Sequence, residues 1–236
     1  MPTALITGAS RGIGAACARR LAAAGFDLLL VARPSAELEA IAVELQALGR
    51  QVHVAPLDLA EPAAIAPAIE ELCRRGGVPE LVVNNAGAAW TGPLTGMPLE
   101  RWQWLLQLNL TSVFQLCGAV VPLLRGRGGG LIVNISSHAA RNAFPDWGAY
   151  CTSKAALAAY SRCLAVEERP HGIRVATLTL GSVNTPLWDS ETVGSSFDRR
   201  AMLAPEQAAD ALLFLAQQPP TQTVEDITLM PAAGAF

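Results

Sequence analysis

Short apolar runs alternate along the chain with longer Ala- and Leu-rich stretches of helical periodicity. The short runs predict strands at residues 3–7, 27–32, 51–56, 81–84, 130–136, 174–180 and 226–229. The longer stretches predict helices at residues 12–24, 35–48, 62–75, 98–124, 147–168 and 205–217. Strands that alternate with helices are typical of a parallel sheet, because each parallel connection needs a crossover. The pattern therefore predicts an α/β fold of about seven strands.

The composition is that of a globular chain with a large core. Of the 236 residues, 51% are hydrophobic and only 16% are charged, which excludes intrinsic disorder. This length, without a linker or repeat, predicts a single domain over residues 1–236. The longest apolar runs break at Arg33, Gln115 and Pro122, short of the roughly 18 residues that a bilayer span needs. We therefore expect no membrane partner.

Charge and cysteine usage favour a cytoplasmic protein. The formal net charge is -3 and the basic residues are scattered, so we expect no nucleic-acid partner. The N-terminus runs directly into the first predicted strand without the features of an export signal. The five cysteines are widely spaced and form no CxxC motif. We therefore expect buried, reduced thiols, and neither a disulfide framework nor a metal site.

A glycine-rich turn joins the first predicted strand to the first predicted helix. It reads Thr7-Gly8-Ala9-Ser10-Arg11-Gly12-Ile13-Gly14. Glycines permit a tight turn and close approach of a ligand, and free N–H groups at a helix start attract an anion such as a pyrophosphate. We therefore expect a dinucleotide site here, although close packing of a helix on a sheet also favours glycine.

The order G-x-x-x-G-x-G after a threonine differs from the common G-x-G-x-x-G fingerprint and resembles the turn of the short-chain dehydrogenase/reductase family. Four further elements match that family in order: Asn84-Asn85-Ala86-Gly87 (NNAG), Asn109, Ser137 thirteen residues before Tyr150-Cys151-Thr152-Ser153-Lys154 (YxxxK), and Gly181 to Thr185, with Leu180 where the family has proline. The resemblance implies a Rossmann-type, doubly wound sheet with helices on both faces and a nicotinamide-dependent oxidoreductase.

Tyr150 and Lys154 are the candidate catalytic pair. They lie four residues apart on a predicted helix, so their side chains share one face. A phenol with a pKa near 10 is a poor base at neutral pH, and a neighbouring ammonium lowers that pKa. We therefore expect Lys154 to make the Tyr150 hydroxyl more acidic.

The resemblance implies a role for each of four residues around one C–O bond. Tyr150 would exchange a proton with the substrate oxygen during hydride transfer, and Ser137 would hydrogen-bond the same oxygen. Lys154 would also bind the nicotinamide ribose, and Asn109 would hold a water of a proton relay. Each residue taken alone also has a structural explanation, such as helix capping for Ser137 or Asn109. The alternative function is a non-enzymatic NADP-binding redox sensor.

The second predicted strand lacks the carboxylate that usually selects NAD. It ends with Ala32-Arg33, and Asp27 lies at its other end. Arg33 and Arg11 could bind a 2′-phosphate, so the sequence predicts NADP(H), unless both are solvated loop arginines. Asp58 matches the family's adenine-contacting aspartate and could also cap a helix. The other predicted cofactor contacts are Gly8, Ser10, Gly12, Ile13, Gly14, Asn85, Ala86, Gly87, Tyr150, Lys154, Gly181, Val183 and Thr185.

Aromatic residues beside the catalytic positions predict the substrate pocket. Trp90, His138, Trp147 and Trp188 would line it and favour an apolar or ring-bearing carbonyl compound, although each could also pack a loop against the body. Residues 185–203 fit neither periodicity and are predicted to form a lid over the substrate, with a disordered loop as the alternative.

Two further expectations concern charge recognition and assembly. Arg141, Arg199 and Arg200 could meet a substrate carboxylate, although a solvated surface position is the simpler interpretation for each. The predicted helices at residues 98–124 and 147–168 resemble those through which family members assemble. We therefore expect a homotetramer, with a dimer second.

Overall fold

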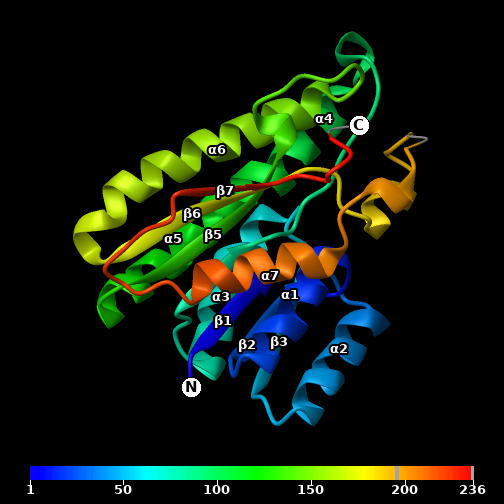
Figure 1. Ribbon diagram of the computed structural model, residues 1–236. Coiled ribbons are helices and arrows are strands. Elements are labelled where there is room, and N and C mark those ends of the chain that lie inside the picture. Colours follow the sequence, from blue (N-terminus) through cyan, green and yellow to red (C-terminus); the bar gives the residue numbers. More distant parts are fainter. Residues whose placement is uncertain (195–196, 235–236) are drawn as a thin grey trace.

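One parallel sheet runs through the molecule in a computed structural model, which describes residues 1–194 and 197–234 (Figure 1). In sheet order its strands are β3 (Val52–Pro56), β2 (Asp27–Ala32), β1 (Thr3–Thr7), β4 (Leu81–Asn84), β5 (Gly130–Ser137), β6 (Ile173–Leu180) and β7 (Asp226–Leu229). Every neighbouring pair is parallel. The predicted α/β fold is confirmed, and no predicted strand boundary is more than one residue from the observed one.

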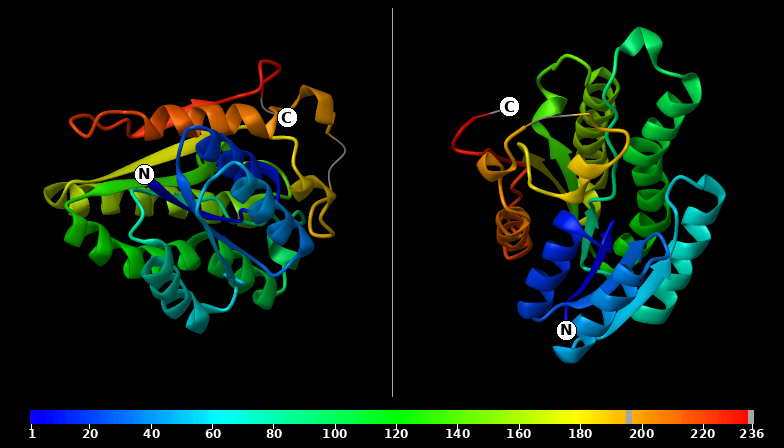
Figure 2. Two further views of the ribbon diagram at one scale, coloured as in Figure 1. Left: turned by 90° about the horizontal axis from the view of Figure 1, so that it is seen from below. Right: turned by 90° about the vertical axis from the view of Figure 1, so that its right-hand side faces the viewer.

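Helices cover both faces of this sheet (Figure 2). One face carries α1 (Gly12–Ala23), α2 (Ala36–Ala47) and α7 (Pro205–Ala216), and the other carries α3 (Pro62–Gly76), α5 (Ser112–Arg127) and α6 (Gly148–Glu168). Successive side chains of a strand point to opposite faces, so Ile6 of β1 packs in the first core and Leu5 in the second. The molecule is therefore a single-domain, Rossmann-type α/β protein.

Short helical turns lie in the connections between these helices and strands. They are η1 (Leu94–Gly96), η3 (His138–Ala140), η4 (Arg169–His171), η5 (Pro186–Asp189) and η6 (Arg199–Ala201). Residues 185–203, predicted to form a lid, contain η5 and η6, while positions 195–196 lie outside the described residues. Within this segment Leu203 returns to the end of β6: Asn184 N–H donates to the Leu203 carbonyl, and Leu203 N–H donates to the Ser182 carbonyl.

The helix predicted at residues 98–124 is not one regular helix. It consists of α4 (Leu99–Leu106), a π-helical segment η2 (Gln107–Thr111) and α5. By length and composition the stretch Leu99–Arg127 could cross a membrane, but 50% of its apolar window is buried inside the domain, as in a core helix. A π-helical segment widens one turn and frequently marks a functional site, and here it carries Asn109.

The strand order reverses at β1, and this reversal locates the site. The chain proceeds from β1 to β2 and β3 on one side and then crosses to β4 on the other. The loops that leave the carboxyl ends of β1 and β4 therefore diverge and open the crevice in which doubly wound sheets bind ligands. The glycine turn follows β1, and Asn84, Ser137 and Leu180 end β4, β5 and β6. The predicted site elements thus converge at one edge of the sheet.

The cysteines follow the predicted pattern only in part. Cys17, Cys73 and Cys117 are buried, whereas Cys151 is half-buried and Cys163 is exposed, and all of them are free thiols. Burial raises the pKa of Cys17 to about 12 and the pKa values of Cys73 and Cys117 to about 11, because a low-dielectric interior disfavours the thiolate. The expectation of buried thiols is therefore wrong for Cys163.

The packing of α3 gives a test of the core. Leu72 is fully buried between the sheet and α5, whereas Leu48, at the end of α2, is 55% exposed. We expect Leu72→Ala to lower the free energy of unfolding by about 2–5 kcal/mol, because it removes apolar contacts and leaves a cavity. The matched variant Leu48→Ala should change it by less than about 0.5 kcal/mol. Urea titration followed by circular dichroism measures both, and equal losses would contradict the assigned core.

Candidate active site

The glycine turn between β1 and α1 has a backbone that only small residues permit. Gly8 and Gly12 have φ angles of 65° and 56°, in the left-handed region where glycine carries no steric penalty. A Cβ added to Gly14 would overlap the Gly8 carbonyl oxygen. The turn therefore stays narrow, and the first N–H groups of α1 are left open to a ligand, which fits the pyrophosphate of a dinucleotide.

The NNAG segment after β4 braces this turn from the side. The Asn85 amide Nδ2 donates to the Thr7 carbonyl oxygen over 2.8 Å. The backbone N–H groups of Asn85 and Ala86 both donate to the Thr7 Oγ1 over 3.0 Å. Thr7 is thus the residue that joins the two loops, a role that its place in the TGxxxGxG motif did not reveal.

Ser137, Tyr150 and Lys154 lie together, although β5 and α6 are separate elements. Ser137 and Tyr150 both line the same cavity, and hydrogen bonding by the Ser137 side chain acts to lower the pKa of the Tyr150 hydroxyl. The Lys154 Nζ lies 5.8 Å from the centre of the Tyr150 ring and donates to the Ile135 carbonyl oxygen over 3.0 Å. Lys154 is buried, with 5% of its surface exposed, so its ammonium is held at a fixed place beside the tyrosine.

Burial is the main cause of the pKa shifts of Tyr150 and Lys154. It raises the pKa of Tyr150, and the hydrogen bond from Ser137 offsets part of that increase. Burial also lowers the pKa of Lys154 to about 8, because the interior solvates the ammonium poorly. The net pKa shift of Tyr150 is therefore upward, opposite to the expected acidification, and Ser137 offsets part of the increase.

Asn109 connects the NNAG loop to α6 from behind the site. Its Oδ1 accepts from the Ala88 N–H, and its Nδ2 donates to the Ala88 carbonyl, both over 2.9 Å. The same Nδ2 donates to the Ser153 hydroxyl over 3.0 Å, and Ser153 donates to the Tyr150 carbonyl over 2.8 Å. The π-helical segment thus directs Asn109 inward as a brace, a contact that the sequence did not predict.

One cavity of about 1020 Å³ joins these parts along the carboxyl edge of the sheet. It is lined by Arg33 and Asp58 beyond β2 and β3, by the glycine turn, and by Ser137 and Tyr150 on the other side of the strand reversal. Of the predicted cofactor contacts, Gly14 alone lies outside the lining, behind the turn, and the catalytic candidate Asn109 lies outside it as well. The volume and the donors fit a dinucleotide together with a small substrate.

Residues 2–194 match the family model described as short chain dehydrogenase. This chain belongs to the short-chain dehydrogenase family. A similar sequence is an uncharacterized oxidoreductase of Mycobacterium tuberculosis, 37% identical over 206 residues, which span 87% of this chain and 76% of the relative.

Solved structures agree with the family assignment over nearly the whole length. A metagenomic short-chain oxidoreductase in complex with NADP has a TM-score of 0.86 and 33% identity, covering 98% of this chain and 97% of the other. Carveol dehydrogenase from Mycobacterium avium, in complex with NAD, has a TM-score of 0.87 and 27% identity, covering 98% and 96%. These relatives support a nicotinamide dinucleotide as the cofactor, and they include both forms of it.

The arginine end of this short-chain dehydrogenase has one carboxylate that sequence analysis missed. Arg11 and Arg33 are exposed and line the cavity, and so does Glu37 in the first turn of α2. The backbone and the Ser35 hydroxyl lower the pKa of Glu37 by hydrogen bonding, and the Arg11 charge adds to this. Asp27 lies at the opposite end of β2, where it accepts from the Gln51 N–H over 2.9 Å. It therefore cannot select the ribose.

The substrate end is walled by aromatic rings. Trp147 lies 5.6 Å, between ring centres, from both Tyr150 and Trp188, and Trp188 lies 5.6 Å from Phe197. His138 also lines this cavity, next to Phe144. Two aromatic lining residues, Trp104 and Phe197, were not predicted, because no local motif connects them with the site.

Trp90 does not line the cavity, contrary to the sequence prediction. Its ring centre lies 6.0 Å from the Arg101 guanidinium carbon, so it packs against α4 and its loop. The three arginines considered for a substrate carboxylate also lie outside the cavity lining. Each pairs with an aspartate: Arg141 with Asp226 at 2.8 Å, Arg199 with Asp189 at 2.9 Å and Arg200 with Asp198 at 3.0 Å.

The acidity of Lys154 can be measured directly, because it is the single lysine of the chain. We expect carbon-13-labelled lysine to give one side-chain NMR signal that titrates near pH 8 in the folded protein without cofactor. In the unfolded chain it should titrate near the ordinary value of 10.5. Since folding lowers this pKa, burial of the ammonium costs stability below pH 8, and that cost disappears as the pH rises to 10.5. A folded midpoint above pH 10 would contradict the described burial.

Proposed function

We propose that this short-chain dehydrogenase uses NADP(H) to interconvert an uncharged, ring-bearing carbonyl compound and the corresponding secondary alcohol. The observation that carries the proposal is the cluster of Ser137, Tyr150 and Lys154 on the same cavity as the glycine turn. The cluster provides proton transfer and hydrogen bonding beside a site built for a dinucleotide.

Tyr150 acts as the general acid in carbonyl reduction. When bound, NADPH supplies the hydride. The raised pKa of Tyr150 keeps its hydroxyl protonated at neutral pH, so it can donate a proton to the substrate oxygen as negative charge develops there. The Ser137 hydroxyl donates a hydrogen bond to the same oxygen, and in alcohol oxidation Tyr150 accepts the proton instead.

Lys154 and Asn109 have supporting roles in the proposed reaction. The Lys154 ammonium is fixed by the Ile135 carbonyl, and we propose that its remaining N–H groups bind the nicotinamide ribose. Asn109 joins the Ala88 peptide to Ser153 of α6 through hydrogen bonds, and we propose that a water beside it completes the proton relay. A non-enzymatic redox sensor is not favoured, because a pure binder needs no proton relay through Tyr150, Ser137 and Asn109.

Two features of the lining support the proposed substrate class. Rings of Trp147, Trp188 and Phe197 form a continuous wall that begins at Tyr150, and such walls bind flat apolar groups. No guanidinium lines the substrate end among the residues described, because Arg141, Arg199 and Arg200 are paired elsewhere. A substrate carboxylate at this end of the cavity would therefore lack an arginine partner.

We further propose a cytoplasmic homotetramer, with a dimer second. Phe114 on α5 and Val166 on α6 are 59% and 67% exposed, and Phe114 lies edge to face with Tyr160 of α6 at 6.4 Å. The outer faces of these two helices thus expose apolar groups that a second copy would cover.

The variant Tyr150→Phe tests the proposed chemistry. It removes the proton donor and keeps the ring, so carbonyl-dependent oxidation of NADPH should fall about 10²- to 10⁴-fold. NADPH binding, followed by the fluorescence of the cofactor, should stay within about threefold, since Tyr150 is one of many predicted cofactor contacts and the others are unchanged. Undiminished turnover would remove Tyr150 from the mechanism, and a parent protein that binds NADPH but reduces no aldehyde, ketone or keto acid would favour the sensor.

Cofactor preference is tested at the arginine end of the cavity. Arg33→Ala should raise the KM for NADPH about 10- to 100-fold, because a charge-assisted hydrogen bond is worth about 1.5–3 kcal/mol, and it should leave the KM for NADH nearly unchanged. Arg74→Ala, which removes an exposed arginine of α3 paired with Glu71, is the matched control. A parent KM that is lower for NADH than for NADPH would refute the preference.

A further inference from the structure

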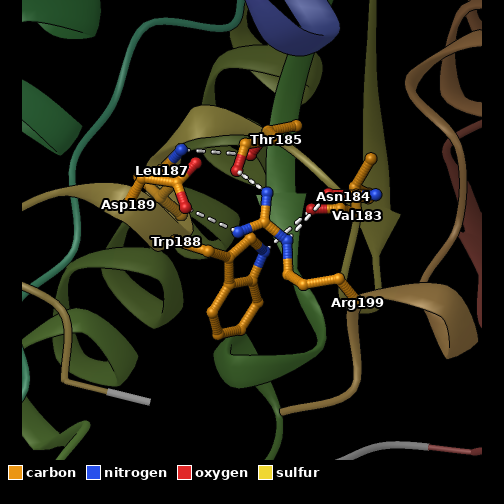
Figure 3. Close-up of polar contacts among 7 residues, drawn as sticks. All are labelled: Val183, Asn184, Thr185, Leu187, Trp188, Asp189 and Arg199. Carbon is orange, nitrogen blue, oxygen red and sulfur yellow. Dashed lines mark hydrogen bonds and ion pairs between the residues drawn. The ribbon is translucent and has the colours of Figure 1, made fainter. Parts of the chain in front are cut away.

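Arg199 joins three points of the loop that follows β6 (Figure 3). Its Nε donates to the Asn184 Oδ1 over 2.7 Å, and its Nη2 donates to the Thr185 carbonyl over 2.9 Å. Its Nη1 donates to the Asp189 Oδ1 over 2.9 Å. The three acceptors lie 10 to 15 residues before it in the chain, so one planar guanidinium fixes the path of residues 184–189.

The loop held in this way carries groups on both halves of the cavity. Val183 and Thr185 line it on the cofactor side, where a Cβ added to Gly12 would lie 3.3 Å from the Thr185 side chain. Trp188 lines it on the substrate side, and its indole Nε1 donates back to the Val183 carbonyl over 2.8 Å. The position of the indole therefore depends on the path of the backbone that Arg199 fixes.

A chain of ring contacts connects this loop to the catalytic tyrosine. Trp188 lies against Trp147, and Trp147 lies edge to face with Tyr150, with 5.6 Å between ring centres at each step. Arg199 itself does not line the cavity. Its influence on a reactant must therefore pass through the loop and Trp188.

Other long-range polar contacts secure the loop on either side of this region. Before it, Asn184 and Leu203 pair through their backbones. After it, the Thr192 hydroxyl donates to the Ala89 carbonyl over 2.8 Å. Between these two points, the Arg199 guanidinium contacts the Thr185 carbonyl and the Asp189 carboxylate (Figure 3).

The next residue, Arg200, gives an internal contrast. Its side chain is 90% exposed and pairs with Asp198, two residues away, whereas the Arg199 side chain is 34% exposed. Both arginines lie in η6. The two arginines therefore share the same helical turn, but Arg199 contacts residues 184–189 and Arg200 contacts Asp198.

We infer that Arg199 is a positioning residue that holds residues 184–189 in place, so that Trp188 forms the wall of the substrate site before any ligand binds. All three nitrogens of its guanidinium donate to the loop, and this side chain lies outside the cavity lining, so it does not receive a substrate carboxylate. The consequence for catalysis rests on the proposed function, whereas the consequence for the loop does not.

The first measurement is hydrogen–deuterium exchange on the full chain without ligands, for Arg199→Ala and the matched control Arg200→Ala. Arg199→Ala should increase exchange in peptides covering residues 183–189, while Arg200→Ala should leave it at the parent level. Arg199→Lys should behave like the alanine variant, because a single ammonium cannot span three separated acceptors. Equal exchange in Arg199→Ala and the parent, or an equal increase in Arg200→Ala, would overturn the inference.

The second measurement separates positioning from folding and from chemistry. With an aryl ketone and NADPH, Arg199→Ala should lower kcat/KM about 10- to 100-fold, mainly through KM, because a displaced wall misorients the substrate. If Arg199→Ala does not fold, Asp189→Asn, which weakens one of the three contacts, should give a smaller change in the same peptides. No change in exchange or KM for Asp189→Asn would then overturn the inference.

The two proposals fail in different ways. A parent protein that reduces no carbonyl compound contradicts the proposed function and leaves the exchange experiment valid. A parent that is active, with an Arg199→Ala variant of unchanged exchange and unchanged KM, contradicts the positioning role and leaves the proposed function standing.

Discussion

The hydrogen bonds of Thr7 hold together the two loops on which the whole site is built. Strand order reverses between β1 and β4, so the loops from these strands would diverge if nothing joined them. Thr7 accepts the N–H groups of Asn85 and Ala86 through its hydroxyl, and its carbonyl accepts the Asn85 amide. The narrow glycine turn, the start of α1 and the floor of the cavity all take their positions from this junction.

A second constraint is the burial of ionisable groups on one side of the junction. Lys154 is buried with its ammonium on the Ile135 carbonyl, and Tyr150 lies beside it under the Trp147 ring. Burial favours the neutral form of both groups, which raises the pKa of the tyrosine and lowers that of the lysine. A neutral phenol is the form that the proposed proton donation by Tyr150 requires.

The substrate side is built from rings and the cofactor side from backbone, and this difference has a physical basis. A pyrophosphate needs several aligned N–H donors at close approach, which glycines and a helix start supply. The proposed ring-bearing substrate needs rigid apolar surface, which Trp147, Trp188 and Phe197 supply by packing on one another. Such rings must themselves be held, and the guanidinium of Arg199 does this from outside the cavity.

Local pattern determined the secondary-structure elements of this chain and the candidate residues of its site. Short apolar runs located every strand to within one residue, because such runs and the turns that bound them are short-range properties of a sequence. The motifs likewise named Ser137, Tyr150 and Lys154. Tertiary structure alone decided the π-helical turn at Asn109, the direction of the pKa shift of Tyr150, the exclusion of Trp90 from the cavity and the use of Arg199 as a brace. Each of these depends on contacts between segments far apart in the chain, and on burial, which no local spacing encodes.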